Sequence, residues 1–530
     1  MATTQQPPAP ERRRTSRAGA LSALTLGLFM IVMDISVVAV AVPAIVRGLG
    51  SSLNDAVWVT SAYLLAYAAP MLVTSRLGDR FGPRRLFLVG TGVFTTASLA
   101  CILVPTVAAL IAVRAVQGVG AALLTPQTLT LVAHLYPAAG RGRAMGLIGA
   151  SSGVATVTGP VLGGVLVDAL GWQGIFVVNV ALGVVTSMLG ASLIPDLGQR
   201  QHRRLDPVGI VLSVTGLALL VFGIQNGARH DWGTIIGPVS VPLVIGTAIA
   251  VLAVFLIRQR GRDPLVPLSV FGDGNFTGGA VLNAAMGFVL TGILLPLVVH
   301  LQVVSGHSAT VSGLFTAPMA VISALVGLVA GYLVDRVDPR LLMLPGLAFA
   351  ATGLGTVSAG MIGAGPGTAL LLGGLGLTGF GLGLVLVPVN TVAMLSLPPG
   401  LRGTASGVFF TARQLGAVLG SAVTAVVLQA VAPGAVREQG ARLQASLAPD
   451  ERVQFSEHVD RLADSELGAG ALPAGDATWS AIALEAFQTG LARATASALV
   501  PHVVVVLLAS VALLWMAPAR RSGSAADQTT

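Results

Sequence analysis

Apolar stretches of about 20 residues or more alternate with short polar breaks along nearly the whole chain. They lie near 18–46, 55–75, 86–105, 107–134, 144–167, 173–194, 207–226, 238–257, 275–302, 310–333, 341–362, 367–396, 403–431 and 487–516. An α-helix needs roughly 20 apolar residues to cross a bilayer core of about 30 Å. The pattern therefore predicts an all-α polytopic membrane protein with about 14 transmembrane helices.

The positions of the arginines predict how these helices are oriented. Arginine clusters precede the first run, follow every second run and occur again after the last run, at Arg520 and Arg521. Because basic loops remain in the cytoplasm, this alternation places both termini there.

A repeated charged segment divides the chain into two related halves. The segment 75–85 (SRLGDRFGPRR) follows the second run, and the similar segment 331–340 (GYLVDRVDPR) follows the tenth. Eight runs separate the copies, which predicts two six-helix bundles with two helices inserted between them. The expected parts are tails at 1–17 and 518–530, an N-terminal bundle at 18–196, a linker with the two extra helices at 197–262, and a C-terminal bundle at 263–517.

One long segment, 432–486, is acidic and is expected on the extracytoplasmic side. Its part from Pro449 to Leu467 has apolar residues at helical spacing, namely Val453, Phe455, Val459 and Leu462. We expect one amphipathic helix there. The segment is either a tolerated insertion or a lid over the transport pathway.

Composition supports a membrane protein and excludes several kinds of chemistry. The chain has 530 residues, of which 54% are hydrophobic and 10% charged, whereas soluble domains carry about 25% charged residues. Every basic residue is an arginine, so neither a lysine-dependent phosphate loop nor a Schiff-base site can exist. Cys101 is the only cysteine, and the histidines lack metal-ligand spacing. We expect no cofactor, no metal and no nucleic-acid partner.

Two opposite charges inside the apolar runs are candidates for proton coupling. Asp34 lies 14 residues beyond Ala20, at a depth of about 21 Å, and Arg114 lies eight residues beyond Thr106, about 12 Å from the other face. Both fall in the outer half of the membrane, within reach of each other. Burial disfavours the ionised carboxylate and a nearby arginine favours it, which suits a group that loads and releases a proton. The alternative is a static buried ion pair.

The repeated segment predicts a cytoplasmic latch that steadies one conformation, formed by Asp79, Arg80, Arg84, Asp335 and Arg336. The alternative is a pair of ordinary basic loops. We also expect polar residues within the helices to line a cavity, namely Gln117, Asn283, Asn390, Arg413 and Gln414.

The segment 155–164 combines small residues with one proline. Gly159, Gly163 and Gly164 would allow another helix to approach closely, and Pro160 can bend a helix. This segment is either a seal or hinge between moving parts or ordinary helix packing.

These motifs together resemble those of the major facilitator superfamily, in particular its fourteen-span drug:proton antiporter family. The segment 75–85 is similar to the superfamily's loop motif, 110–118 to the fourth-helix motif whose arginine is associated with proton coupling, 155–164 to the antiporter motif, and 34–43 to a first-helix motif. Ser75, Ala155, Ser36 and Ala39 depart from the usual residues.

The resemblance implies a proton-driven exporter of small lipophilic drugs or antibiotics in a bacterial cytoplasmic membrane, and not an enzyme. It would use the proton gradient as its energy source, contact membrane lipids and act as a monomer. A related carrier for a lipid, an amino acid or a secondary metabolite is the alternative, and a membrane-embedded enzyme or a channel is a third hypothesis.

Overall fold

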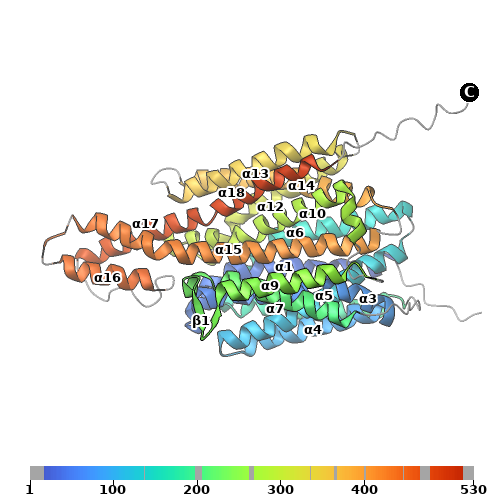
Figure 1. Ribbon diagram of the computed structural model, residues 1–530, viewed down its shortest axis with the longest axis horizontal. Helices are drawn as coiled ribbons and strands as arrows, with labels where there is room; N and C mark the ends of the chain where they lie inside the picture. Colours follow the sequence, from blue (N-terminus) through green and yellow to red (C-terminus); the bar gives the residue numbers. More distant parts are fainter. Residues whose placement is uncertain are drawn as a thin grey trace, which may run out of the picture.

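Long helices lie side by side along one direction in the computed structural model (Figure 1). The structure describes residues 17–136, 138–196, 206–261, 268–334, 336–362, 367–398, 402–445, 447–449, 451–465 and 478–516. Helices make up almost all of these residues, as the periodicity predicted. We call the end of the bundle at which the first helix begins the inner end, and the opposite end the outer end.

The first half contains seven helical segments that form six crossings. They are α1 (Arg17–Leu49), α2 (Leu53–Ala68), α3 (Met71–Phe81), α4 (Pro83–Leu103), α5 (Val107–Leu135), α6 (Ala138–Leu170) and α7 (Gly174–Leu193). The second crossing is broken between α2 and α3, where Pro70 precedes α3 and cannot donate a backbone hydrogen bond. Neither piece alone is long enough to cross a membrane, whereas together they span the predicted second run.

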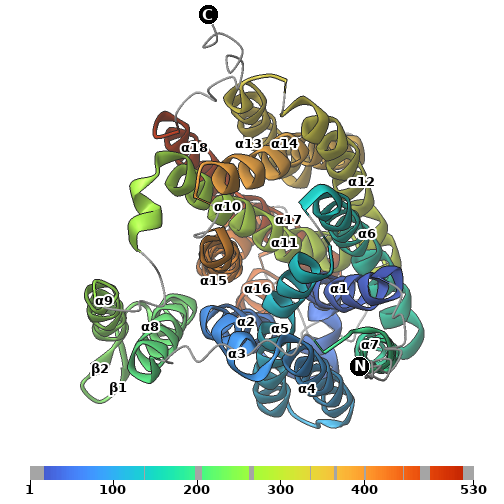
Figure 2. The same cartoon turned by 90° about the vertical axis from the view of Figure 1, so that its right-hand side faces the viewer.

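Two peripheral helices follow, α8 (Pro207–Gln225) and α9 (Val241–Arg258), joined at the outer end by η1 (Ala228–His230) and by the strands β1 (Thr234–Ile236) and β2 (Val239–Ser240). Figure 2 shows them at the edge of the bundle. At the inner end, Asp206 caps α8 by accepting a hydrogen bond from the Gly209 amide, and it forms an ion pair of 2.9 Å with Arg258 of α9. Hydrogen bonds from Arg258 hold the pKa of Asp206 below its usual value, so this clamp stays ionised at neutral pH.

The second half repeats the pattern with longer and less regular segments. They are η2 (Leu268–Gly272), α10 (Gly274–Gly292), α11 (Leu294–Val299), η3 (His300–Val304), α12 (Ala309–Leu333), α13 (Pro339–Ile362), α14 (Gly367–Leu395), α15 (Arg402–Gln444), α16 (Arg452–Asp464), α17 (Thr478–Ser497), α18 (Val500–Ser510) and η5 (Val511–Leu514). The segment η3 is a π-helix that completes the crossing begun by α10.

Thirteen helices within the described residues are long and apolar enough to cross a membrane. The crossing formed by α2 and α3 is not among them because it is broken into two shorter helices. The prediction of about 14 transmembrane helices is therefore confirmed.

Much of the long outer segment, expected to contain one amphipathic helix, consists of extensions of the neighbouring helices. Helix α15 continues past 431 to Gln444, and the last crossing begins at Thr478 rather than near 487. Pro433 does not end α15, because the extended helix packs closely on its neighbours: Gly490 of α17 lies against the backbone of Val436, and Gly440 lies against Val459 of α16. These helices extend beyond the rest of the bundle at the left of Figure 1.

The amphipathic helix in this outer segment was predicted correctly, with one exception on its apolar face. Phe455, Val459 and Leu462 of α16 are buried against α15 and α17, but Val453 is 63% exposed. Arg437 of α15 pairs with Asp460 of α16 at 3.0 Å, which fixes the other side of the contact.

The two halves meet most clearly at the outer end. Gly164 of α6 lies against the backbone of Ala309 and Thr310 at the start of α12, and Gly313 of α12 lies against the backbone of Pro160. A side chain at either glycine would clash with backbone, so the close packing of these two helices depends on glycine.

Candidate functional site

A buried ion pair joins α1 to α5. Nη1 of Arg114 lies 2.7 Å from Oδ2 of Asp34, and both side chains are 0% exposed. The depth estimate from the sequence placed these residues within reach of each other, and the structure brings them into direct contact. Their predicted role in proton coupling stays a prediction.

Two amides complete the surroundings of the carboxylate. The Asn179 amide on α7 donates to Oδ1 of Asp34 at 2.5 Å, and the Gln117 amide donates to the same oxygen at 3.3 Å. Gln117 also donates to the Ser98 hydroxyl of α4 at 2.8 Å. The carboxylate thus accepts hydrogen bonds from two neutral groups in addition to its ion pair, all of them buried.

The guanidinium of Arg114 is held on several sides. Its Nη1 also donates to Oε1 of Gln117 at 2.6 Å, its Nε donates to the Val59 carbonyl of α2 at 3.2 Å, and the Tyr63 ring lies 4.2 Å from its central carbon. The remaining nitrogen, Nη2, is buried and lacks a hydrogen-bond partner among the described residues. Helices α1, α2, α4, α5 and α7 therefore all contribute to one polar cluster inside an apolar bundle. We call Asp34, Ser98, Arg114, Gln117 and Asn179 the charge cluster.

The glycine-rich helix packs directly beside the charge cluster. Gly159 of α6 lies against Ser36, and Gly163 lies against Val37, both on the turn of α1 that follows Asp34. Gly164 points instead to α12 of the other half. The predicted segment is thus placed between the helix that carries Asp34 and the opposite half, with Pro160 inside one continuous helix.

Three of the predicted latch residues, Arg80, Arg84 and Arg336, lie apart from the charge cluster, near the inner end. Arg84 donates from Nη2 to the Ala191 carbonyl at the end of α7 at 2.6 Å, a contact within the first half. Arg80 is exposed, and Arg336 stacks on Tyr332 with its central carbon 4.0 Å from the ring. The side chain of Asp79 and all of Asp335 lie outside the described residues, so the latch stays a prediction.

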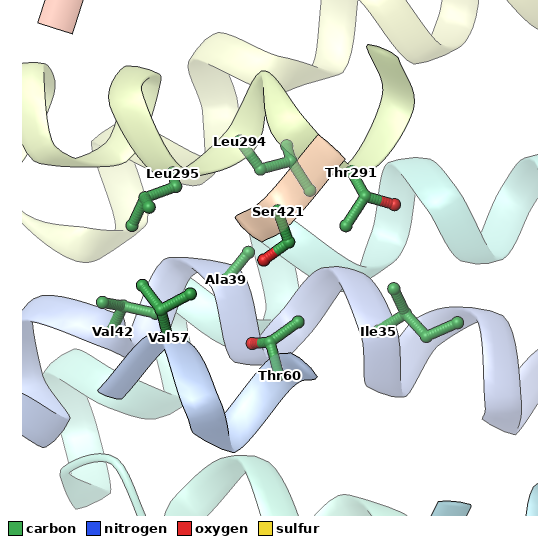
Figure 3. Close-up of a pocket in the computed structure, with 9 residues that line it drawn as sticks. All are labelled: Ile35, Ala39, Val42, Val57, Thr60, Thr291, Leu294, Leu295 and Ser421. Atoms are coloured by element: carbon green, nitrogen blue, oxygen red, sulfur yellow. The ribbon is translucent and has the colours of Figure 1, made fainter. Parts of the chain in front are cut away.

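A small cavity of about 20 Å³ lies between the halves. Figure 3 shows its lining: Ile35, Ala39, Val42, Val57, Thr60, Thr291, Leu294, Leu295 and Ser421. One water molecule needs about 10–15 Å³, so this conformation leaves no space there for a drug-sized molecule.

The five residues expected to line a cavity are spread over different parts of the fold, and none lines the small cavity in Figure 3. Gln117 belongs to the charge cluster, Asn283 donates to the Phe409 carbonyl of α15 at 2.9 Å, and Asn390 donates to Leu386 of its own helix at 2.6 Å. Arg413 and Gln414 lie in the first third of α15, about three turns after its start.

Some contacts at the outer end were not anticipated from the sequence. Gln302, in the π-helix η3, donates to the Val40 carbonyl of α1 at 3.0 Å. Asp168, at the outer end of α6, accepts hydrogen bonds from the backbone amides of Ala309 and Thr310 at 3.2 and 2.8 Å. It therefore caps α12 from the other half of the molecule.

Comparison with known proteins identifies the family. The model for the Major Facilitator Superfamily matches residues 24–421. The chain belongs to the Major Facilitator Superfamily. It is therefore a multi-pass bacterial membrane protein that transports solutes, and it is not an enzyme.

Some of the relatives in this superfamily bear names that refer to drug resistance or antibiotic export. An uncharacterised MFS-type transporter of Mycobacterium tuberculosis is 43% identical over 411 residues, which cover 77% of this chain and 70% of the relative. The multidrug resistance protein Stp of the same species is 34% identical, and the tetracenomycin C resistance and export protein of Streptomyces glaucescens is 33% identical; each match covers 77% of this chain and 75% of the relative.

A solved structure supports the fold. A bacterial homologue of the human lysosomal transporter Spinster, in an inward-facing and unoccupied conformation, aligns with a TM-score of 0.61 and 19% identity. The alignment covers 96% of this chain and 100% of that structure. The predicted major facilitator fold is confirmed.

Proposed function

We propose that this transporter exports small lipophilic drugs or antibiotics in exchange for protons. The observation that carries the proposal is the buried pair of Asp34 and Arg114, with two further amides directed at the carboxylate. A carboxylate with an arginine partner is stable when ionised, and without that partner burial favours its protonated form. A change in the contacts of Asp34 as the helices move would therefore load or release one proton.

The proposed cycle alternates the side from which the site is open. With the outer ends of α6 and α12 closed, the substrate enters from the inner end. Rocking of the halves then opens the outer end, where a proton from the outside neutralises Asp34 and the substrate leaves. The proton is released at the inner end after the return stroke.

Efflux from inverted membrane vesicles tests this proposal. A panel of lipophilic dyes and antibiotics is offered to the wild type and to Asp34→Asn, with and without an uncoupler. We expect gradient-driven transport in the wild type that the uncoupler abolishes and that is absent in the Asp34→Asn variant. Transport by the variant at the wild-type rate would remove Asp34 from the mechanism.

A carrier for a specific physiological cargo is the second candidate. The names of the relatives favour drug export, since the Stp and tetracenomycin proteins are named for resistance or export. If the wild type moves none of the panel while the purified protein binds an endogenous lipid or metabolite, the narrower cargo replaces the drug.

A further inference from the structure

Arg413 lies near the middle of the membrane-spanning part of α15. It follows Arg402, at the inner start of the helix, by 11 residues, or about 16 Å along an axis that crosses a core of about 30 Å. Gly287 of α10 packs against the backbone carbonyl of Arg413, which fixes this turn of α15 within the second half. The side chain lies near Tyr67 of α2, in the first half.

The guanidinium of Arg413 has no compensating charge in the described part of the chain. Arg114 pairs with Asp34, and Arg493 lies 3.6 Å from Glu438. By contrast, no carboxylate of a described residue forms an ion pair with Arg413, and no described acceptor takes a hydrogen bond from it. Arg413 is partly exposed, whereas the Nε2 atom of the adjacent Gln414 is buried and has no acceptor among the described residues.

An unpaired cation at this depth is costly, and charges kept in such positions generally serve transport. A guanidinium presents five N–H donors, and it binds planar oxyanions such as carboxylates through two parallel hydrogen bonds. Lipid phosphates lie at the membrane surface, so Arg413 near the middle of the core is poorly placed to bind them. The partner that fits is an acidic group brought in by a ligand.

The surroundings suggest the rest of that ligand. Ser421, two turns further along α15, lines the small cavity between the halves about 12 Å from Arg413. That lining consists of aliphatic side chains and the hydroxyl groups of Thr60, Thr291 and Ser421, without a charge. An apolar body would therefore be accepted on the outer side of Arg413 once the halves move apart.

We propose that Arg413 is an anion-binding site for the exported molecule, so that this transporter takes lipophilic compounds with one ionised acidic group. This inference rests on the proposed export function, for which it names the substrate class. The uncharged lining on the outer side of Arg413 lacks an acidic residue that would select cationic drugs.

A matched pair of ligands tests the proposal. Binding of 1-pyrenebutyrate and of its methyl ester to the purified full-length protein in detergent is measured by fluorescence, for the wild type, Arg413→Gln, Arg413→Lys and Arg493→Gln. We expect the wild type to bind the acid at least about tenfold more tightly than the ester, because a charged hydrogen-bonded contact contributes at least that much. Arg413→Gln should remove this preference, Arg413→Lys should keep part of it, and Arg493→Gln should keep it fully.

Binding of the ester serves as the control for folding. If Arg413→Gln binds the ester as the wild type does and loses only the preference for the acid, the proposal stands. Equal binding of acid and ester by the wild type, or an unchanged preference in Arg413→Gln, overturns it. Loss of both ligands by both Arg413 variants also overturns it, since the side chain would then be structural.

The proposed export function fails separately from this inference. It fails if wild-type vesicles show no gradient-dependent efflux of any compound, even where the purified protein prefers the acid.

Discussion

Asp34 and Arg114 compensate each other's charge inside the membrane, so replacing one of them affects both the stability of the protein and its transport activity. Removal of one partner from a buried pair leaves an uncompensated charge and costs about 3–5 kcal/mol of stability. A loss of transport in a single variant could then reflect misfolding. The double variant Asp34→Asn/Arg114→Gln removes both charges and keeps similar side-chain volumes.

We expect this double variant to insert and to unfold near the wild-type temperature, yet to lose gradient-driven efflux. The reason is that no carboxylate would remain to carry the proton, although the buried charge is also gone. Efflux and thermal unfolding in detergent are measured together. Restored efflux in the double variant would establish the pair as a static structural element.

Asn179 is the neutral residue with the shortest hydrogen bond to Asp34, and its removal is the second prediction at this scale. Asn179→Leu keeps the volume and removes one donor to the carboxylate, a loss of about 1.5–3 kcal/mol of differential stabilisation. We expect gradient-driven efflux to fall roughly 10- to 100-fold at unchanged expression. Thr186→Val is the matched control, because Thr186 is equally buried on α7 and lies outside the charge cluster. Equal effects of the two substitutions would contradict a role for Asn179.

The sequence identified the charged members of the cluster but not Asn179. Charges within apolar runs are rare, so Asp34 and Arg114 were conspicuous and their depths could be estimated from helical rise. An asparagine in a transmembrane helix costs less free energy than a charge, so its presence alone does not indicate a function. Which residue it contacts depends on how α7 packs against α1. That packing depends on tertiary structure, which the hydropathy pattern of one helix does not contain.

Among the elements, α6 is the one that touches both the charge cluster and the opposite half. Gly164→Leu would push a side chain into the backbone of Ala309, so the outer ends of α6 and α12 could no longer close. In a Cys101→Ala background, we expect a cysteine at Val161 to react faster with a membrane-impermeant maleimide when Gly164→Leu is present. Val161 is suited to this purpose because its backbone contacts Gly313 of α12.

Gly149→Leu is the control for this experiment. It adds the same side chain to the same helix at a position with no neighbour within 4 Å. An unchanged labelling rate in Gly164→Leu would mean that the contact between α6 and α12 is not the outer closure.

The outer projection formed by α15, α16 and α17 gives a prediction about an element whose role the sequence left open. Gly490 already packs on Val436, so α15 and α17 support each other without α16. We expect replacement of residues 446–477 by a short Gly-Ser linker to leave efflux within about twofold of the wild type, a change of under roughly 0.5 kcal/mol. A larger loss of efflux, with normal insertion, would favour a lid over a tolerated insertion.

The hydropathy pattern could not predict the helix boundaries in this projection, for a physical reason. Outside the bilayer, α15 is stabilised by its contacts with α16 and α17 and by the ion pair between Arg437 and Asp460, and not by an apolar environment. The apolar run therefore ends near 431 although the helix continues to Gln444. Hydropathy also misses the boundary in the second crossing, where the apolar run continues although the helix breaks at Pro70 before α3.

For the whole molecule, the number of protons per cycle follows from the inventory of buried acids. Asp34 is the only buried carboxylate among the described residues. We therefore predict that one proton enters for each substrate molecule that leaves. With a neutral substrate one positive charge moves inward per cycle, and with a monovalent acid the export of the anion adds a second.

The reversal potential in proteoliposomes measures this charge directly. A tenfold gradient corresponds to about 59 mV for one charge, so at equal pH on both sides about 59 mV should balance a tenfold gradient of a neutral substrate and a hundredfold gradient of a monovalent acid. The acid and the neutral compound must therefore differ by one charge per cycle while the proton count stays at one. Equal charge for the two would contradict the export of the ionised acid, and a higher count for the neutral compound would require a proton carrier besides Asp34.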